Sequence, residues 1–325
     1  MNRILRLALA AAAAIALGWC QAAIAQGFPV KPIRIVLPFP PGGPTDTLAR
    51  LLGSKVSVSV GQPVLVENRP GGAGQIAAAA LMQSDPDGYT VMIADMGVLS
   101  INSSLYRTLS YRAERDFAPV TNLTVMPMIL LVPAASRAGS VAELVALSKT
   151  EANGLNYASQ GPGSGGHLMA ELFRTATGAR LTHVPYKGSA PAIADLIADR
   201  CDLLFDVTLV ARPNIASGKL KALAAASASR TPFFPELKTL NELGYPKLVM
   251  DAWFGLVARA GTSPAVIQRL NTEFVKALED PELNRRFAEI AMVPRPMPPE
   301  QFAAFMRSEA ATWGAAVKEF DIHVD

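Results

Sequence analysis

The stretch that decides the fold is Ile33-Arg34-Ile35-Val36-Leu37, followed at once by Pro38-Phe39-Pro40-Pro41-Gly42-Gly43-Pro44-Thr45-Asp46. The first five residues are β-rich and mostly apolar, which predicts a short buried strand. The glycine- and proline-rich segment predicts a loop, and the apolar positions between Leu48 and Val56 then recur at helical spacing. A strand that passes through such a loop directly into a helix is the building unit of α/β folds.

The same alternation continues along the chain. Amphipathic stretches such as Ala192–Ile197 lie between short apolar runs, and the short connections predict parallel sheets flanked by helices. From Ser263 onward the pattern is purely helical, beginning with an N-cap serine and Pro264. The candidate strands are Ile33–Leu37, Val64–Val66, Thr90–Ala94, Met128–Val132, Leu155–Ala158, Thr182–Val184, Asp202–Phe205, Ala222–Ala226 and Phe254–Ala258.

Length and composition exclude several classes of protein. The 325 residues are 50% hydrophobic and 18% charged, which suits two domains with a sizeable core, and no flexible linker separates two halves. A net charge of +3 with no basic run argues against nucleic-acid binding. Because the chain has three histidines and two cysteines, we expect neither a metal site nor a cofactor.

The N-terminus has the pattern of a secretory signal peptide. Arg3 and Arg6 precede the apolar run Leu7–Leu17, which is too short to span a bilayer, and Ala23-Ile24-Ala25 supplies a cleavage pattern. Residues 1–25 are therefore predicted to be removed, leaving a soluble exported protein. A lipoprotein modified at Cys20 is the competing interpretation, but the preceding residue is the bulky Trp19. Cleavage leaves Cys201 alone, predicted to be a buried structural thiol without a disulfide.

Four polar or glycine-rich segments follow predicted strands: Pro38–Asp46, Asp95–Val98, Ser159–His167 and Asp206–Thr208. Ligands of open α/β sheets bind beyond the carboxyl ends of strands, so we expect these segments to converge on one site. The first and third lead directly into helices, where free N–H groups and close backbone approach favour anions. Two such helix termini facing one cleft would hold a small carboxylate without an arginine.

Enzymatic interpretations find little support in the motifs. Gly161, Gly163 and Gly166 match a dinucleotide fingerprint, but no acidic residue ends the next strand, and no nucleophile elbow or phosphate-binding loop occurs. His167 could activate Ser159 or Ser164, although a loop anchor is the favoured role. We therefore predict a protein that is not an enzyme, with an exported enzyme acting on a small organic acid through Asp206 or His167 as the alternative.

Three carboxylates are candidates for the site. Asp46 stands at a helix start, where stabilisation of the helix end and contact with the pocket are equally supported. Asp95 and Asp206 each end an apolar strand, a position that favours the cleft.

Several motifs occur together and in order. They are Pro38-Phe39 with Gly42-Gly43-x-x-Asp46, Glu67-Asn68-Arg69-Pro70-Gly71, Asp87-Gly88-Tyr89-Thr90, Asp116-Phe117-Ala118-Pro119-Val120, Tyr157-Ala158-Ser159, His183-Val184-Pro185-Tyr186-Lys187-Gly188 and Trp253-Phe254-Gly255-Leu256. From about Pro29 to the C-terminus the chain resembles the Bug proteins, the TctC-like extracytoplasmic solute receptors of tripartite tricarboxylate transporters.

The resemblance implies a type II periplasmic-binding-protein fold with two α/β lobes, two crossovers and a cleft between the lobes. It places residues 26–126 and 250–325 in lobe 1 and residues 127–249 in lobe 2. It also implies a periplasmic monomer that captures a small organic acid and passes it to membrane transporter subunits. The implied ligand-binding residues are Phe39, Pro41, Gly42, Gly43, Thr45, Asp46, Asp95, Gly97, Val98, Ser159, Gly163, Ser164, Gly165, His167, Tyr186 and Asp206.

Departures from the family pattern bear on the ligand. Hydroxyl side chains that relatives commonly carry in the segments around Gly97, Ser164 and Val207 are missing here, and the carboxylate of Asp95 is added. A further anion in a partly desolvated cleft would repel a di- or tricarboxylate. We therefore expect a monocarboxylate with an amine or a ring nitrogen for Asp95 to hold. A ligand sensor for a membrane signalling partner remains an alternative role.

Overall fold

The computed structural model describes residues 27–319, so the predicted signal peptide and its cleavage site lie outside the described residues. The strands are β1 Ile33–Leu37, β2 Val64–Asn68, β3 Thr90–Asp95, β4 Phe117–Pro133, β5 Leu155–Ser159, β6 Leu181–Pro185, β7 Leu203–Val207, β8 Leu220–Ala225, β9 Asp251–Arg259 and β10 Val293–Pro294. The helices are α2 Pro44–Val60, α3 Gln75–Met82, α4 Asn102–Leu105, α5 Ala113–Asp116, α6 Val141–Thr150, α7 Gly165–Thr177, α8 Ser189–Ile197, α9 Thr208–Ala216, α10 Pro264–Leu278, α11 Pro281–Glu289 and α12 Pro299–Glu319. A short 3-10 turn, Gly72–Gly74, and a π-helical turn, Gly97–Ile101, complete the elements.

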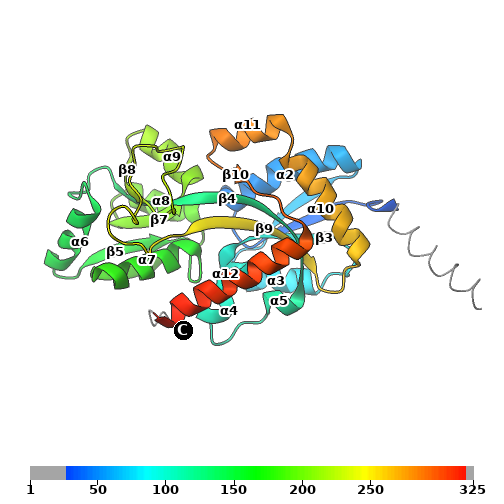
Figure 1. Cartoon of the computed structure of the whole chain (residues 1–325), viewed down its shortest axis with the longest axis horizontal. Coiled ribbons are helices and arrows are strands. Elements are labelled where there is room, and N and C mark those ends of the chain that lie inside the picture. Colours follow the sequence, from blue (N-terminus) through cyan, green and yellow to red (C-terminus); the bar gives the residue numbers. More distant parts are fainter. Residues whose placement is uncertain (1–26, 320–325) are drawn as a thin grey trace, which may run out of the picture.

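The strands form two groups that share one long strand (Figure 1). In the first sheet half, β1 pairs in parallel with β2 and β3, and β9 pairs antiparallel with β3. In the second sheet half, β5 pairs in parallel with β6 and β7. The carboxyl ends of β1, β3, β5 and β7 carry the loops that the sequence singled out.

Strand β4 joins the two halves. Its first part, Phe117–Pro127, pairs with β9, and its last part, Met128–Pro133, pairs with β7 and β8. These pairings are antiparallel, so the expectation of parallel sheets was wrong for the centre of the fold. The sequence predicted only Met128–Val132 of this strand. Prolines at positions 119 and 127 and the polar residues Thr121, Asn122 and Thr124 interrupt the apolar pattern, and the pairing with β9 is irregular there.

The chain returns to the first sheet half through β9 and the C-terminal helices. Ser263 caps α10 as predicted, accepting a hydrogen bond from the Val266 N–H. Helix α10 packs on α2 and β4, and α12 packs on β4, α4 and the π-helical turn (Figure 1). The expectation of a purely helical C-terminal region was wrong at one point, because Val293–Pro294 adds a short strand to the edge of β4.

Trp253 anchors α12 to β9. Its ring packs at steep angles on Phe302 and Phe305, and its Nε1 donates to Glu309 Oε2 at 2.8 Å. A Cβ on the neighbouring Gly255 would lie 2.3 Å from the Phe302 ring, so only glycine lets the helix approach this closely. Cys201 is buried, as predicted.

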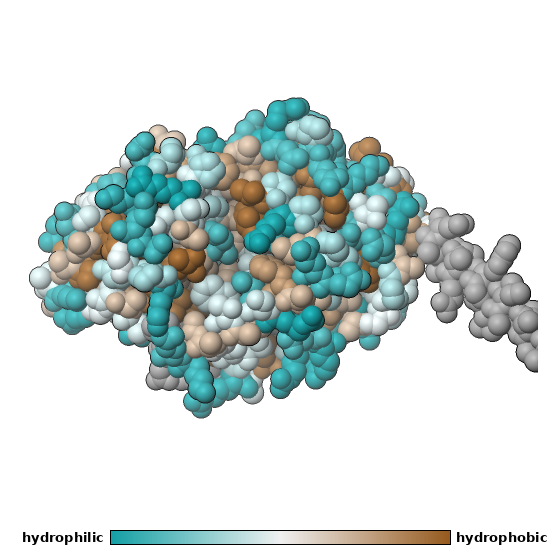
Figure 2. Space-filling model, in the orientation of Figure 1, coloured by the Kyte–Doolittle hydropathy of each residue, from teal (hydrophilic) through white to brown (hydrophobic). Residues whose placement is uncertain are grey.

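The outside of the molecule is of mixed polarity. On the face shown in Figure 2, apolar residues are scattered among hydrophilic ones rather than gathered in one large patch. Within residues 27–319, no helix combines the length and the apolar character that crossing a bilayer requires.

Candidate functional site

Two adjoining cavities lie between the loops of the two sheet halves. The first, which we call the Asp206 cavity, has a volume of about 50 Å³ and is lined by Phe39, Pro40, Pro41, Gly43, Pro44, Thr45, Asp95, Met96, Met128, Gln160, Ser164, Gly165, Gly166, Gly188, Ser189, Ala190, Asp206, Val207 and Ala252. The second, the Asn102 cavity, has a volume of about 190 Å³ and is lined by Pro38, Phe39, Pro40, Pro70, Gly71, Gly72, Ala73, Gly74, Asp95, Val98, Asn102, Gln160, Gly161, Pro162, Gly163, Ser164, Tyr186 and Lys187. They share several wall residues, among them Phe39, Asp95 and Ser164, and so form one continuous site.

Three helices begin at the wall of the Asp206 cavity. The N-cap of α2 is Gly43, that of α7 is Ser164 and that of α8 is Gly188. Ser164 is the only one of these three with a side chain, and its Oγ accepts from the His167 N–H at 3.3 Å. The partial positive charges of three helix termini therefore face one small space, which favours an anionic group there.

Two carboxyl groups share that space. Asp95 and Asp206 are 8% and 2% exposed, and both line the Asp206 cavity. Burial raises the pKa of each to about 6, although nearby hydrogen-bond donors favour the ionised forms. The lining of this cavity, which is wholly within the described residues, includes no lysine, arginine or histidine. The acids therefore lack a protein counter-charge in the cavity.

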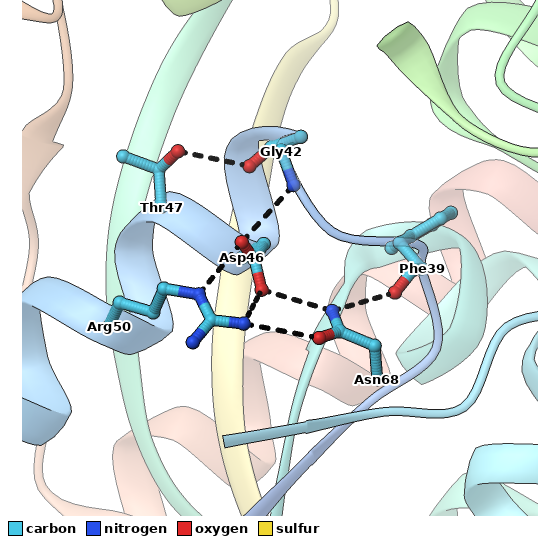
Figure 3. A network of polar contacts seen from close by, with 7 residues as sticks. Phe39, Gly42, Asp46, Thr47, Arg50 and Asn68 are labelled. Atoms are coloured by element: carbon cyan, nitrogen blue, oxygen red, sulfur yellow. Dashed lines mark hydrogen bonds and ion pairs between the residues drawn. The ribbon is translucent and has the colours of Figure 1, made fainter. Parts of the chain in front are cut away.

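The carboxylate of Asp46 is directed into the protein rather than toward the ligand space (Figure 3). It accepts hydrogen bonds from the Gly42 N–H at 3.1 Å, Arg50 Nε at 2.9 Å and Asn68 Nδ2 at 3.0 Å. Burial acts to raise the pKa of Asp46, but these hydrogen bonds outweigh it and hold the pKa below its ordinary value. Asn68 Nδ2 also donates to the Phe39 carbonyl, so this network fixes the loop from Phe39 to Gly43.

Replacing Asp46 with alanine is expected to destabilise the protein by about 2 kcal/mol, because several donors lose an ionised acceptor while Arg50 is still half-exposed to water. The matched control is Lys31→Ala, which removes an exposed ion pair with Asp87 and a cation–π contact with Tyr89 and should destabilise the protein less than Asp46→Ala does. Urea unfolding of both variants checks this. Equal midpoints for the Asp46 variant and the wild type would contradict a structural role for the carboxylate.

A column of stacked rings supports the loop between β5 and α7. The rings of His167 and His183 lie 4.2 Å apart, and Tyr157 stacks on His183 at 4.7 Å. His167 Nδ1 accepts from the Gly163 N–H at 3.2 Å. Burial lowers the pKa of His167 to about 4 and also lowers that of His183, so both rings are neutral at physiological pH. His167 is thus a loop anchor, the role favoured from the sequence.

Ser159 and His183 have the spacing of a nucleophile and its base, with 2.7 Å between Oγ and Nε2. However, Ser159 is fully buried, and its Oγ also accepts from the Gly161 N–H at 3.1 Å. Ser164 Oγ donates to the Gly161 carbonyl at 2.7 Å. Both hydroxyls therefore hold the loop in shape, and neither is paired with His167 Nδ1.

Beside the site, the loops of the two sheet halves contact each other at glycine residues. A Cβ on Gly97, which follows β3, would lie 2.5 Å from the carbonyl oxygen of Gly163, which follows β5. A Cβ on Gly163 would lie 2.4 Å from Asn102 Oδ1, and Gly163 also has a positive φ of 78°. A Cβ on Gly188 would lie 3.0 Å from Pro40. These contacts leave no room for side chains, so the loops of the two sheet halves are in direct contact beside the site.

The predicted site residues divide into two groups. Those that line one or both cavities are Phe39, Pro41, Gly43, Thr45, Asp95, Val98, Gly163, Ser164, Gly165, Tyr186 and Asp206. Those that line neither are Gly42, Asp46, Gly97, Ser159 and His167, which instead shape or support the lining loops. The predicted set therefore contains both residues of the cavity walls and residues that support those walls.

In the loop between β6 and α8 the sequence identified Tyr186 but not Gly188, and it did not identify Ser189 at the start of α8; both line the Asp206 cavity. Gln160, within the predicted segment Ser159–His167, was not named either; it lines the same cavity, and its Nε2 donates to the Phe205 carbonyl at 2.9 Å. The signal was present, since Gly188 follows a predicted strand and precedes a predicted helix, the same arrangement that identified the other loops. Within the described residues, no cluster of three or more His, Cys, Asp or Glu side chains could hold a metal ion.

Comparison with known proteins supports the same architecture. The family model described as the tripartite tricarboxylate transporter family receptor matches residues 48–322. The structure titled "R. palustris Rpa4515 with adipate" is 34% identical, covers 91% of this chain and all of its own, and has a TM-score of 0.88. The periplasmic binding protein BugD is 31% identical with the same coverage and a TM-score of 0.87.

MatC from Rhodopseudomonas palustris, solved with bound malate, is 32% identical and covers 89% of this chain and all of its own, with a TM-score of 0.86. These likenesses confirm the predicted fold class, a two-lobed α/β periplasmic-binding-protein fold. They also confirm the resemblance to the Bug proteins. The chain belongs to the family of tripartite tricarboxylate transporter receptors.

Proposed function

We propose that this protein is a periplasmic receptor that captures a small monocarboxylate carrying an amine or a ring nitrogen, for uptake by a tripartite tricarboxylate-type transporter. The observation that carries the proposal is the composition of the Asp206 cavity. Three helix N-termini favour an anion there, while two buried carboxyl groups without a protein cation favour a positive or hydrogen-bonding nitrogen. A ligand with both groups satisfies both requirements.

The size of the site supports a small ligand. The Asp206 cavity has a volume of about 50 Å³, which suits one charged end of a molecule, and the Asn102 cavity has room for the remainder. The family relatives with adipate and malate hold dicarboxylates. In this chain a second carboxylate in the Asp206 cavity would be repelled by Asp95 and Asp206.

The proposed architecture has lobe 1 at residues 26–126 and 250–325 and lobe 2 at residues 127–249, consistent with the change of partners along β4. Ligand would close the cleft by shifting a population of open and closed forms, without covalent chemistry. We propose that the exported protein acts as a monomer and that the closed form is recognised by the membrane subunits. The residues that line the two cavities are the proposed ligand contacts.

Thermal melting against matched acids tests the function. The panel contains alanine with lactate, γ-aminobutyrate with γ-hydroxybutyrate, and nicotinate with benzoate, so that each pair differs mainly in the nitrogen. Malate and adipate represent the dicarboxylates. A ligand at 100 times its Kd adds about 2.7 kcal/mol, enough to raise the Tm by several degrees. We expect the largest rise from a nitrogen-bearing monocarboxylate. A large rise with adipate or malate and none with the nitrogen-bearing acids would contradict the proposal.

A further inference from the structure

The two acids of the Asp206 cavity are not equivalent. Asp95 Oδ1 accepts a hydrogen bond from the Val98 N–H at 3.1 Å, and the Gly97 N–H also favours its ionised form. Asp95 thus lies over the first N–H groups of the π-helical turn Gly97–Ile101, which act as its partners. Its carboxylate is already stabilised by the protein.

Only one of the two carboxylate oxygens of Asp206 accepts a hydrogen bond from the described residues. Its Oδ1 accepts from the Val207 N–H at 2.8 Å, whereas Oδ2 is buried and receives no hydrogen bond from any donor in residues 27–319. The side chains of Gln160 and Ser189 lie close enough to Asp206 to favour its ionised form, but neither donates a hydrogen bond to Oδ2. A buried carboxylate oxygen without a donor is costly, and such groups in native proteins commonly mark a site of function.

A ligand in the Asp206 cavity is in position to supply a hydrogen-bond donor to Asp206 Oδ2. Asp206 lines the cavity on which α2, α7 and α8 converge, so a ligand carboxylate near these termini lies close to Asp206. The nearest cation among the described lining residues, Lys187, belongs to the Asn102 cavity and is exposed. The ligand itself is thus the remaining source of a positive donor.

We propose that Asp206 is the specificity-determining residue of the site and that its free Oδ2 accepts a hydrogen bond from a ligand ammonium group, while Asp95 is held by its own backbone and contributes little to this choice. The inference rests on the proposed function and narrows it from any nitrogen to a donating, positively charged one. It also assigns the nitrogen to Asp206 instead of Asp95, the residue favoured from the sequence. A ring nitrogen without a hydrogen would find no donor in an ionised Asp206.

Isothermal titration calorimetry with two matched pairs tests this assignment. Alanine and lactate, and γ-aminobutyrate and γ-hydroxybutyrate, are titrated into the wild type, Asp206→Asn and Asp95→Asn. We expect the wild type to bind the amino member of at least one pair more tightly than its hydroxyl partner. A charge-assisted hydrogen bond contributes about 10- to 100-fold in affinity, so Asp206→Asn should lose a preference of that size. Asp95→Asn should keep it.

The outcomes separate the two proposals. If the wild type prefers neither amino acid over its hydroxyl partner, or binds neither pair, the assignment of a ligand ammonium group to Asp206 is wrong, while the proposed function is then decided by nicotinate and benzoate in the melting panel. If the wild type shows the preference but Asp206→Asn retains it, the proposed function stands and Asp206 is not the selecting residue. Loss of the preference in Asp95→Asn alone would transfer the role to Asp95. Asp206→Ser, checked for folding by circular dichroism, serves as the second variant.

Discussion

Replacing Asp206 with asparagine is expected to make the ligand-free protein more stable at neutral pH by about 2 kcal/mol. Burial raises the pKa of Asp206 from 3.8 to about 6, which corresponds to about 3 kcal/mol of unfavourable free energy for the ionised form. The buried amide of the variant needs partners of its own, which offsets part of that gain. A residue kept for ligand recognition at the expense of stability is the expected pattern for a binding site.

The pH dependence identifies the source of this effect. Because the pKa of Asp206 is higher in the folded than in the unfolded protein, the folded protein binds more protons between pH 3.8 and about 6. The contribution of Asp206 to stability is therefore present below pH 3.8 and is lost as the pH rises toward 6. The difference in unfolding free energy between Asp206→Asn and the wild type should be smallest below about pH 4 and reach its full size above about pH 6.

Urea unfolding across this pH range measures the difference, and Asp95→Asn is the matched control. Burial raises the pKa of Asp95 to about 6 as well, but its carboxylate accepts from the Val98 N–H. Asp206 Oδ1 likewise accepts from the Val207 N–H, but Asp206 also has the buried Oδ2, which receives no hydrogen bond from the described residues. Replacing Asp95 should therefore stabilise the protein less than Asp206→Asn does. An Asp206→Asn variant that is less stable than the wild type at every pH would show that Asp206 Oδ2 has a donor within the protein.

Replacing Gly97 with alanine is expected to weaken binding of every ligand by about 10- to 100-fold. The added Cβ would lie 2.5 Å from the Gly163 carbonyl oxygen, a backbone atom of the opposite sheet half that cannot rotate away. Overpacking of this kind costs about 1–3 kcal/mol, and here the strain is relieved if the cleft opens. Gly97 does not have a positive φ, so alanine meets no backbone penalty of its own.

Two measurements separate closure from general damage. Small-angle scattering of the wild type with the best ligand of the melting panel should show contraction, and Gly97→Ala with the same ligand should contract less. Gly139→Ala is the matched control, because a Cβ at Gly139 has its nearest neighbour at 3.4 Å, the flexible side chain of Glu143 in the first turn of α6. All three ligand-free proteins should unfold at similar urea concentrations. Unchanged affinity and contraction in Gly97→Ala would contradict the role of this contact in closure.

Strands β1, β3 and β5 and their loops could be predicted because each strand is short and has glycine or proline close to both ends, whereas β7 was predicted from its apolar run alone. The runs ending at Leu37 and Ala158 are examples in which a buried strand leads through a glycine-rich loop into a helix. The first part of β4 could not be found in this way. Its prolines and its buried threonines are accommodated by irregular pairing with β9, a tertiary effect that no local pattern contains.

The sequence did not predict which side chains of these loops face the cavities and which are hydrogen-bonded inside the protein. Asp46, Ser159 and His167 belong to the predicted loops, yet each is committed to hydrogen bonds inside the protein. Their partners lie up to 24 residues away in sequence, as with Ser159 and His183, so a motif cannot distinguish a ligand contact from a support. The different surroundings of Asp95 and Asp206 are likewise a matter of which backbone N–H groups face each carboxylate.

The position of the ligand nitrogen can be observed in a crystal structure of the protein with the nitrogen-bearing monocarboxylate that gives the largest melting shift. We predict the ligand carboxylate at the N-termini of α2 and α7 and the ligand nitrogen within hydrogen-bond distance of Asp206 Oδ2. A ligand bound with its nitrogen directed away from both Asp206 and Asp95, or bound outside the two cavities, would contradict this prediction.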